Sequence, residues 1–467
     1  MTTIIDLGRQ MGMELGLRAA RKLRPADRHG IPVAPGFIPG IGHIPAMMAD
    51  LPRLCAEGDK LGPLFWLYMI PGKWVLATVR EEAFAIFRNR DTSSANFVRD
   101  GEIVVGQSVL GLDGDPHRRV RGALNAPFTP KGLTANRAGA LIAEVIEPGV
   151  ARWRSRGELP ISDETREFAV DVIFRMMGIA SNDLSRWREA FEQYLLSVFP
   201  PRWDLPGLPY RRGLNAKRWI DERLLRIIEA ARKQDPDSSM VAGMVRGRDD
   251  QGRGLSDAEL LDNLRILVFA GHETTASTMA WALLYLGLDR PRWRRLVDEA
   301  LAADRLPSTP EELGRFPFAE GIFREALRLH PPLAFDSRLV IQPFSLLGRT
   351  FQPGEEVALS LHNLSRNAAR YPDPDKFIPE RLLDRTSGRG KKPGPLETAQ
   401  FGGGPHFCLG YHVAWLEAVS FLVCVGKTMG AAGLAPITVG GALPTAWYMP
   451  IQRPPRSARL RFERDRS

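Results

Sequence analysis

The chain has 467 residues, a formal net charge of +9 and a sequence pI of about 9.7, with 44% hydrophobic and 25% charged residues, which is typical of a soluble globular protein. Its arginines are dispersed, with no interleaved aromatic ladder and no nucleic-acid-binding motif, so a nucleic-acid partner is not expected. Cys55, Cys408 and Cys424 are too few and too scattered for a disulfide framework or a zinc site.

The N-terminal segment, residues 1–24, is predicted to be an amphipathic basic helix. Such a helix can lie on a membrane surface, but we favour packing against the protein's own body. Residues 32–42 follow as a stiff Pro/Gly connector. Because we find no apolar run of about 18 residues and no signal-peptide core, we predict a cytoplasmic location, with membrane contact at most peripheral.

The next segments mix strand-like and irregular patterns. Residues 64–68 and 74–78, separated by Pro71 and Gly72, are predicted to form a β-hairpin. Residues 91–112 are irregular and carry apolar side chains, Val104 among them, as is typical of functional or mobile segments.

A helix is predicted to begin near Asp115-Pro116, with His117 and Arg121 four residues apart on one face. Two such donors could bind a pair of carboxylates. Without further context, however, a His/Arg pair at this spacing is more typical of a solvated helix start.

The longest helical pattern begins with a capping box at residues 256–259 and continues to Leu288. Its middle, residues 270–275, reads Ala-Gly-His-Glu-Thr-Thr, and several of these residue types are poor choices for a helix interior. This choice is explained either by a structural kink or by a functional site on the helix.

Another helix ends at Pro331 and carries Glu325 and Arg328 on one face, a spacing that is usually a surface ion pair. A strand region follows from about residue 333 to Leu361. Further on, residues 377–381 end in Arg381.

The loop at residues 401–410 places Cys408 after a glycine-rich turn and before an apolar, helix-like run. Nearby backbone N–H groups and the positive end of the helix dipole favour a thiolate there. An arbitrary cysteine is more often a buried structural residue. Here, however, the pattern F-x-x-G-x-H-x-C-x-G is met at all of its specified positions, Phe401, Gly404, His406, Cys408 and Gly410.

This loop resembles the haem-binding loop of the cytochrome P450 family. The H-x-x-x-R pair, the A-G-x-E-T-T segment and the E-x-x-R and P-E-R segments precede it in the family's order, over residues 115–410. The resemblance implies a mainly α fold with small β-sheets, in which a long central helix lies over haem b and the cysteine loop lies on the proximal side. It implies one haem-binding catalytic domain over residues 43–467, after an N-terminal helix and hinge at residues 1–42.

The resemblance also implies roles for single residues. Cys408 would bind the iron as its thiolate. Gly271 would let the helix open for dioxygen, Thr274 would hydrogen-bond the oxygen and Glu273 would relay protons, whereas His272 has no assigned role beyond a pocket or solvent-relay contact. The remaining expected sites are haem contacts at His117, Arg121, Ala270, Gly271, Arg338, Phe401, His406 and Gly410, a structural lock of Glu325, Arg328 and Arg381, and a substrate pocket with Val104, Leu333, Ala334 and Phe335.

We therefore predict a monomeric haem-thiolate monooxygenase that uses O₂ on an apolar substrate such as a terpene, a fatty acid or a steroid. Electrons would come from a ferredoxin or flavodoxin with its NAD(P)H reductase, drawn to a basic surface that includes Arg118, Arg119, Lys391 and Lys392. Two alternatives remain open. A peroxygenase or isomerase would usually lack the acid–alcohol pair that is present here, and nothing in the sequence supports a non-catalytic haem sensor.

Overall fold

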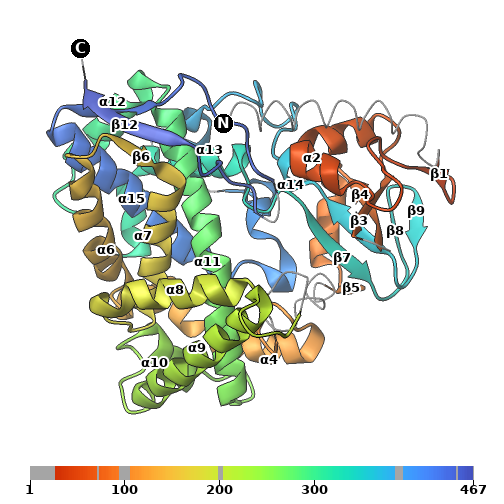
Figure 1. Ribbon diagram of the computed structural model, residues 1–467. Helices are drawn as coiled ribbons and strands as arrows, with labels where there is room; N and C mark the ends of the chain where they lie inside the picture. Colours follow the sequence, from red (N-terminus) through yellow and green to blue (C-terminus); the bar gives the residue numbers. More distant parts are fainter. Residues whose placement is uncertain are drawn as a thin grey trace.

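The computed structural model describes residues 27–70, 73–93, 106–197, 203–383, 393–448 and 451–465. These residues form a large helical body beside a smaller part rich in β-strands (Figure 1). The predicted fold class, mainly α with small sheets, is therefore confirmed. The predictions for residues 1–24, for Pro71 and Gly72, for Val104 and for Lys391 and Lys392 lie outside the described residues.

The helices are α2 (Ile44–Asp59), α4 (Gly114–Leu124), α5 (Pro130–Ala135), α6 (Ala138–Trp153), α7 (Ile161–Met176), α8 (Leu184–Leu195), α9 (Pro209–Ala231), α10 (Met240–Arg246), α11 (Asp257–Leu286), α12 (Arg290–Leu301), α13 (Pro317–Leu329), α14 (Leu361–Leu364) and α15 (Tyr411–Ala431). The 3₁₀ turns are η1 (Glu81–Arg88), η3 (Ala126–Phe128), η4 (Ser181–Asp183), η5 (Pro310–Arg315), η6 (Pro379–Leu382), η7 (Pro395–Phe401) and η8 (Gly404–His406).

The largest sheet has the strand order β3-β4-β10-β7-β5, from β3 (Phe65–Ile70), β4 (Lys73–Thr78), β10 (Glu356–Leu359), β7 (Asp336–Val340) and β5 (Thr92–Ser93). Strands β3 and β4 pair antiparallel, as the hairpin prediction required. The other sheets join β11 (Leu434–Thr438), β12 (Arg459–Arg464) and β6 (Glu158–Pro160), then β8 (Phe344–Leu346) with β9 (Arg349–Phe351), and β1 (Asp27–Arg28) with β2 (Ile31–Pro32).

Helix α11 runs through the helical body (Figure 1). Its 30 residues span about 45 Å at 1.5 Å per residue. The predicted capping box is present, with the Ser256 hydroxyl accepting from the Glu259 N–H and the Glu259 carboxylate accepting from the Ser256 N–H. The helix ends at Leu286, slightly before the predicted end. Most of its C-terminal half is buried, which makes it the centre of the hydrophobic core.

Within the described part of the chain, one helix, α15, is long and apolar enough to cross a membrane. However, 72% of its most apolar stretch is buried inside the protein, as in the core helix of a soluble protein. Gly426 and Gly430 explain how closely it packs, since a Cβ on Gly426 would lie 3.2 Å from Leu296 Cγ and one on Gly430 would lie 2.4 Å from Val297 Cγ1, both on α12.

Candidate active site

The cysteine loop is held by its own backbone. The Cys408 N–H donates to the Phe401 carbonyl at 2.8 Å, and Cys408 is half-buried between η8 and α15. Gly404 has a φ of +62°, and a Cβ there would lie 2.4 Å from the carbonyl oxygen of Phe87 in η1. Only glycine fits this position, because both the dihedral angle and the space exclude a side chain.

The loop does not by itself favour the thiolate, contrary to our expectation. Burial raises the pKa of Cys408, and this effect outweighs a hydrogen bond from the Gly410 backbone and the positive charge of Arg121. A metal ion deprotonates a thiol that coordinates it. The loop therefore suits a sulfur that becomes anionic when it binds a cation.

Two histidines from separate motifs meet beside the cysteine loop. The ring centroids of His117 on α4 and His406 lie 4.0 Å apart. His406 Nε2 lies 2.9 Å from the carboxylate of Asp113, so the contact seen for His406 is with a protein carboxylate, whereas the predicted contact is with the haem. The pKa of His117 is lowered to about 4, chiefly by burial and then by the charges of His406 and Arg121.

His117 and Arg121 make few hydrogen bonds or ion pairs with the described residues. Buried His117 Nε2 lacks a hydrogen-bond partner among the described residues. The half-buried Arg121 guanidinium forms no ion pair with any carboxylate in the described ranges, and its charge acts on Cys408. A buried imidazole nitrogen without a partner and a guanidinium without a carboxylate partner, both near a cysteine, fit a cofactor that carries carboxylates.

Arg338 approaches the same region from β7. It is buried, and its Nη1 donates to Asp336 Oδ1 at 3.0 Å and to the Ser337 carbonyl at 2.8 Å. Its guanidinium lies 4.5 Å over the Phe87 ring, and a Cβ on Gly403 would lie 3.2 Å from Phe87 Cβ. Phe87, which no motif indicated, therefore lies between Arg338 and the cysteine loop.

The middle of α11 is more open than its surroundings. Ala270 is exposed and Thr274 is half-exposed, although the residues that follow are buried. The expected opening of the helix at Gly271 is not seen. Instead, the helix is continuous and the Thr274 hydroxyl donates to the Ala270 carbonyl at 2.8 Å. A Cβ on Gly271 would lie 2.7 Å from Ile173 Cδ1, so this glycine allows α7 to pack closely.

Glu273 belongs to a half-buried charge cluster. Its Oε1 lies 2.5 Å from Arg166 Nη2 on α7 and 3.5 Å from His272 Nε2, while its buried Oε2 has no hydrogen-bond partner in the described part of the chain. Burial is the largest effect on the pKa of Glu273 and raises it, but His272, Arg166 and Arg453 together lower it to about 2. Glu273 is therefore a carboxylate at neutral pH. His272 Nδ1 lies 2.7 Å from the Val268 carbonyl.

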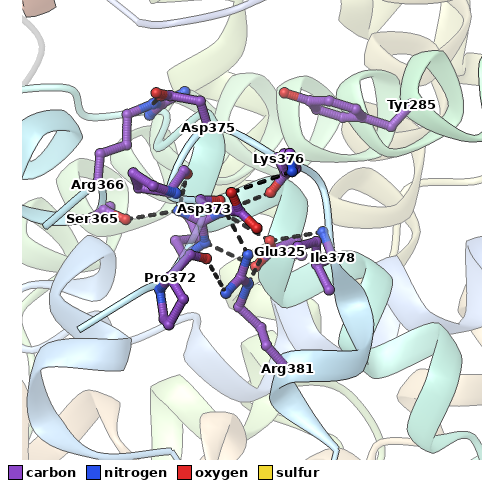
Figure 2. Close-up of polar contacts among 12 residues, drawn as sticks. Tyr285, Glu325, Ser365, Arg366, Pro372, Asp373, Asp375, Lys376, Ile378 and Arg381 are labelled. Atoms are coloured by element: carbon purple, nitrogen blue, oxygen red, sulfur yellow. Dashed lines mark hydrogen bonds and ion pairs between the residues drawn. The ribbon is translucent and has the colours of Figure 1, made fainter. Parts of the chain in front are cut away.

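Glu325 and Arg328 form a buried pair and not a surface pair. Arg328 Nε donates to Glu325 Oε2, and Arg328 Nη2 donates to Glu325 Oε1, both at 2.8 Å. The same Oε1 accepts from Arg381 Nε at 3.0 Å and from the Ile378 N–H at 2.9 Å (Figure 2). The structure thus brings the three predicted lock residues together.

This cluster is connected to the cysteine loop through Ser365. Arg328 Nη1 donates to the Ser365 carbonyl at 2.9 Å, and Gln400 Nε2 donates to the Ser365 hydroxyl at 2.7 Å. Gln400 is the residue before Phe401, at the end of η7. No sequence motif indicated Ser365 or Gln400.

The pocket residues predicted after α13 differ in exposure. Ala334 is buried and its carbonyl accepts from the His362 N–H at 3.1 Å. Phe335 is half-buried, whereas Leu333 is 39% exposed. Val104 lies outside the described residues.

Comparison with known proteins identifies one family. The sequence model of the family "Cytochrome P450" matches residues 35–425. The chain is 38% identical to "Cytochrome P450 BJ-4 homolog" of Sinorhizobium fredii and 37% identical to "Cytochrome P450 BJ-4" of Bradyrhizobium diazoefficiens, in each case over 93% of this chain and 97% of the relative.

Solved structures agree with this result. The retinoic acid-bound cyanobacterial CYP120A1 has a TM-score of 0.77 and 26% identity over 93% of this chain and 100% of that chain. The cytochrome P450 CYP102L1 has a TM-score of 0.74 over 89% of this chain and 97% of that chain, and its 20% identity supports the fold alone.

Fold and site define a haem-dependent oxidoreductase. The chain belongs to the cytochrome P450 family and is a monooxygenase that uses haem b. Bacterial members of the family generally take electrons from a ferredoxin and its reductase and use O₂.

Proposed function

We propose that Cys408 binds the iron of haem b and that the enzyme oxidises an apolar organic substrate with O₂. The observation that supports this most strongly is the convergence of Cys408 with His117, whose Nε2 has no partner among the described residues, and with Arg121, whose charge acts on Cys408. When bound, haem supplies the redox chemistry of O₂ activation. One oxygen atom enters the substrate, and the other leaves as water with two electrons and two protons.

In this proposal, the protein's own groups hold the cofactor from several elements. His117 and Arg121 on α4, Arg338 on β7 and His406 in the cysteine loop would donate to its carboxylates. Phe401 and Gly410 lie at the two ends of the cysteine loop and keep the sulfur in place. Glu325, Arg328 and Arg381 hold the segment before this loop through Ser365 and Gln400.

The open part of α11, with Ala270 and Thr274 on one face and the backbone of Gly271 beside them, would line the space in which O₂ reacts. The Thr274 hydroxyl would accept and donate protons at its Oγ1, and the Glu273 carboxylate would relay protons toward it from solvent. Arg166 and His272 keep Glu273 ionised and in place. Because the acid and the alcohol are adjacent on one helix, we favour O₂ chemistry over a peroxygenase or isomerase.

The proposed substrate is apolar, such as a terpene, a fatty acid or a steroid. Ala334 and Phe335 offer apolar surface, with Leu333 and Val104 as further pocket residues. The retinoic acid in the related CYP120A1 structure, a long apolar acid, supports this substrate class.

We further propose a cytoplasmic monomer with residues 43–467 as one catalytic domain after a helix and hinge at residues 1–42. Its electrons would come from a ferredoxin or flavodoxin and an NAD(P)H reductase, and its membrane contact would be peripheral at most.

Isotope labelling tests this function. The holoenzyme is screened with apolar compounds for a spin-state change, then supplied with ferredoxin, reductase and NADPH under ¹⁸O₂. We expect one ¹⁸O atom in each product molecule and none when the label is in water. Product that forms only with added peroxide, and carries the peroxide's label, would replace the proposal with a peroxygenase. No product with any redox partner or peroxide would favour the sensor.

A further inference from the structure

Two oxidisable aromatic side chains lie next to the cysteine loop and have no part in the proposed function. Tyr411 and Trp415 are on the first turns of α15, three and seven residues after Cys408. Their ring centroids lie 4.8 Å apart at an interplanar angle of 42°. Tyr411 also contacts Phe401 and Phe407 of the loop, with ring centroids at 4.8 and 5.2 Å. The two rings therefore form a continuous path from the loop into the protein.

A half-buried carboxylate lies at the inner end of this path. Burial raises the pKa of Glu320 on α13, and smaller effects from the Arg324 charge and from Trp415 lower it. Arg324 Nη1 lies 3.7 Å from Glu320 Oε1, and Arg324 Nη2 lies 3.1 Å from Glu397 Oε2. Trp415 is 6% exposed, so Glu320 is the acceptor available for its Nε1 proton.

The outer residue has a different environment. Tyr411 is half-buried, and burial raises the pKa of its phenol to about 12. The phenol is therefore neutral at physiological pH and still carries its proton. A phenylalanine at this position would make the same ring contacts but would be much harder to oxidise.

We propose that Tyr411 and Trp415 are a one-electron donor pair, which reduces the haem centre when an oxidant reaches it without substrate. This rests on the proposed binding of haem iron by Cys408. With hydrogen peroxide as oxidant, one molecule takes two electrons and two protons, its O–O bond breaks and two water molecules form. Trp415 gives one electron and its Nε1 proton moves to Glu320, while Tyr411 gives the other electron and releases its phenolic proton. The two protons that form water are taken from solvent. When the redox partner returns both electrons, Trp415 recovers its proton from Glu320 and Tyr411 takes one from solvent.

Rapid-freeze EPR tests this pair. The substrate-free ferric holoenzyme is mixed with hydrogen peroxide and frozen within milliseconds, and the haem absorbance is followed in parallel. We expect tryptophanyl and tyrosyl signals in the wild type and in Trp203→Phe, a control at a 65% exposed tryptophan. Trp415→Phe should lose the tryptophanyl signal, and the double variant with Tyr411→Phe should lose both and bleach several-fold faster. Glu320→Gln, which keeps the indole, should slow formation of the neutral tryptophanyl radical.

Each outcome decides the proposal. Equal radical yield and bleaching in the double variant and the wild type would overturn it, as would no radical in a wild type that bleaches at the rate of the double variant. The reduced carbon monoxide spectrum is recorded first for every variant. A wild type without thiolate-ligated haem would refute the proposed function. Failure of the radical test in a protein with normal thiolate ligation would refute the donor pair alone.

Discussion

Arg328 offers a quantitative test of the network behind the cysteine loop. Arg328→Met removes both hydrogen bonds to Glu325 and the donors to the carbonyls of Ser365, Pro374 and Lys376. Removing one partner of a buried ion pair costs about 3–5 kcal/mol. For 467 residues, an unfolding entropy of about 2.1 cal/mol/K per residue amounts to about 1 kcal/mol/K, so we expect Tm to fall by about 3–5 °C.

Calorimetry of the holoenzyme measures this change, with Arg305→Met as the control. Arg305 pairs with Glu312 but is 50% exposed on its side chain, so its loss should cost about 0–1 kcal/mol and shift Tm by about 1 °C or less. Arg328→Met should also lose part of its thiolate-type carbon monoxide band, because Ser365 and Gln400 connect the network to the loop. Equal shifts in the two variants, with unchanged spectra, would refute the reasoning.

Three further predictions concern the site itself. Thr274→Ala should reduce product per NAD(P)H several-fold and release more peroxide, measured with a coupled peroxidase; unaltered coupling would remove Thr274 from the mechanism. Gly404→Ala should sharply lower haem content on purification, because its Cβ would lie 2.4 Å from the Phe87 carbonyl oxygen, whereas Gly394→Ala, with nothing within 4 Å, should not; equal haem content would contradict the steric argument. The pKa of Glu273 is depressed from 4.5 to about 2, so its contribution to stability is present above pH 4.5 and is lost as the pH falls toward 2. Melting curves between pH 5 and pH 3 should therefore fall less steeply for Glu273→Gln than for the wild type, and parallel curves would contradict the assigned shift.

The fold class could be predicted from the sequence because each motif is a short run of neighbouring residues that can be identified without the structure. Gly404 could be singled out because it is a specified position of the cysteine-loop pattern, although the Phe87 carbonyl that excludes a side chain there is known only from the structure. The capping box of α11 and the pairing of β3 with β4 are likewise set by neighbouring residues, and the structure has both.

Contacts between distant segments were not predictable. Arg166, which pairs with Glu273, lies on another helix more than a hundred residues earlier, and no pattern marks it. Gly271 was interpreted through oxygen chemistry alone, yet its lack of a side chain also serves the packing of Ile173. The prediction that Cys408 is a thiolate was based on the loop's N–H groups and the helix dipole. It left out burial, which has the largest effect on the pKa of Cys408 and raises it. Packing partners and desolvation depend on the whole fold.

The central claim is that Cys408 binds the haem iron as a thiolate. The most direct test is the absorbance spectrum of the dithionite-reduced protein with carbon monoxide, for the wild type and Cys408→Ala. We expect a strongly red-shifted Soret band in the wild type and its loss in the variant. A wild-type band at the ordinary histidine–haem position, or a variant with an unchanged spectrum, would contradict the assignment of Cys408.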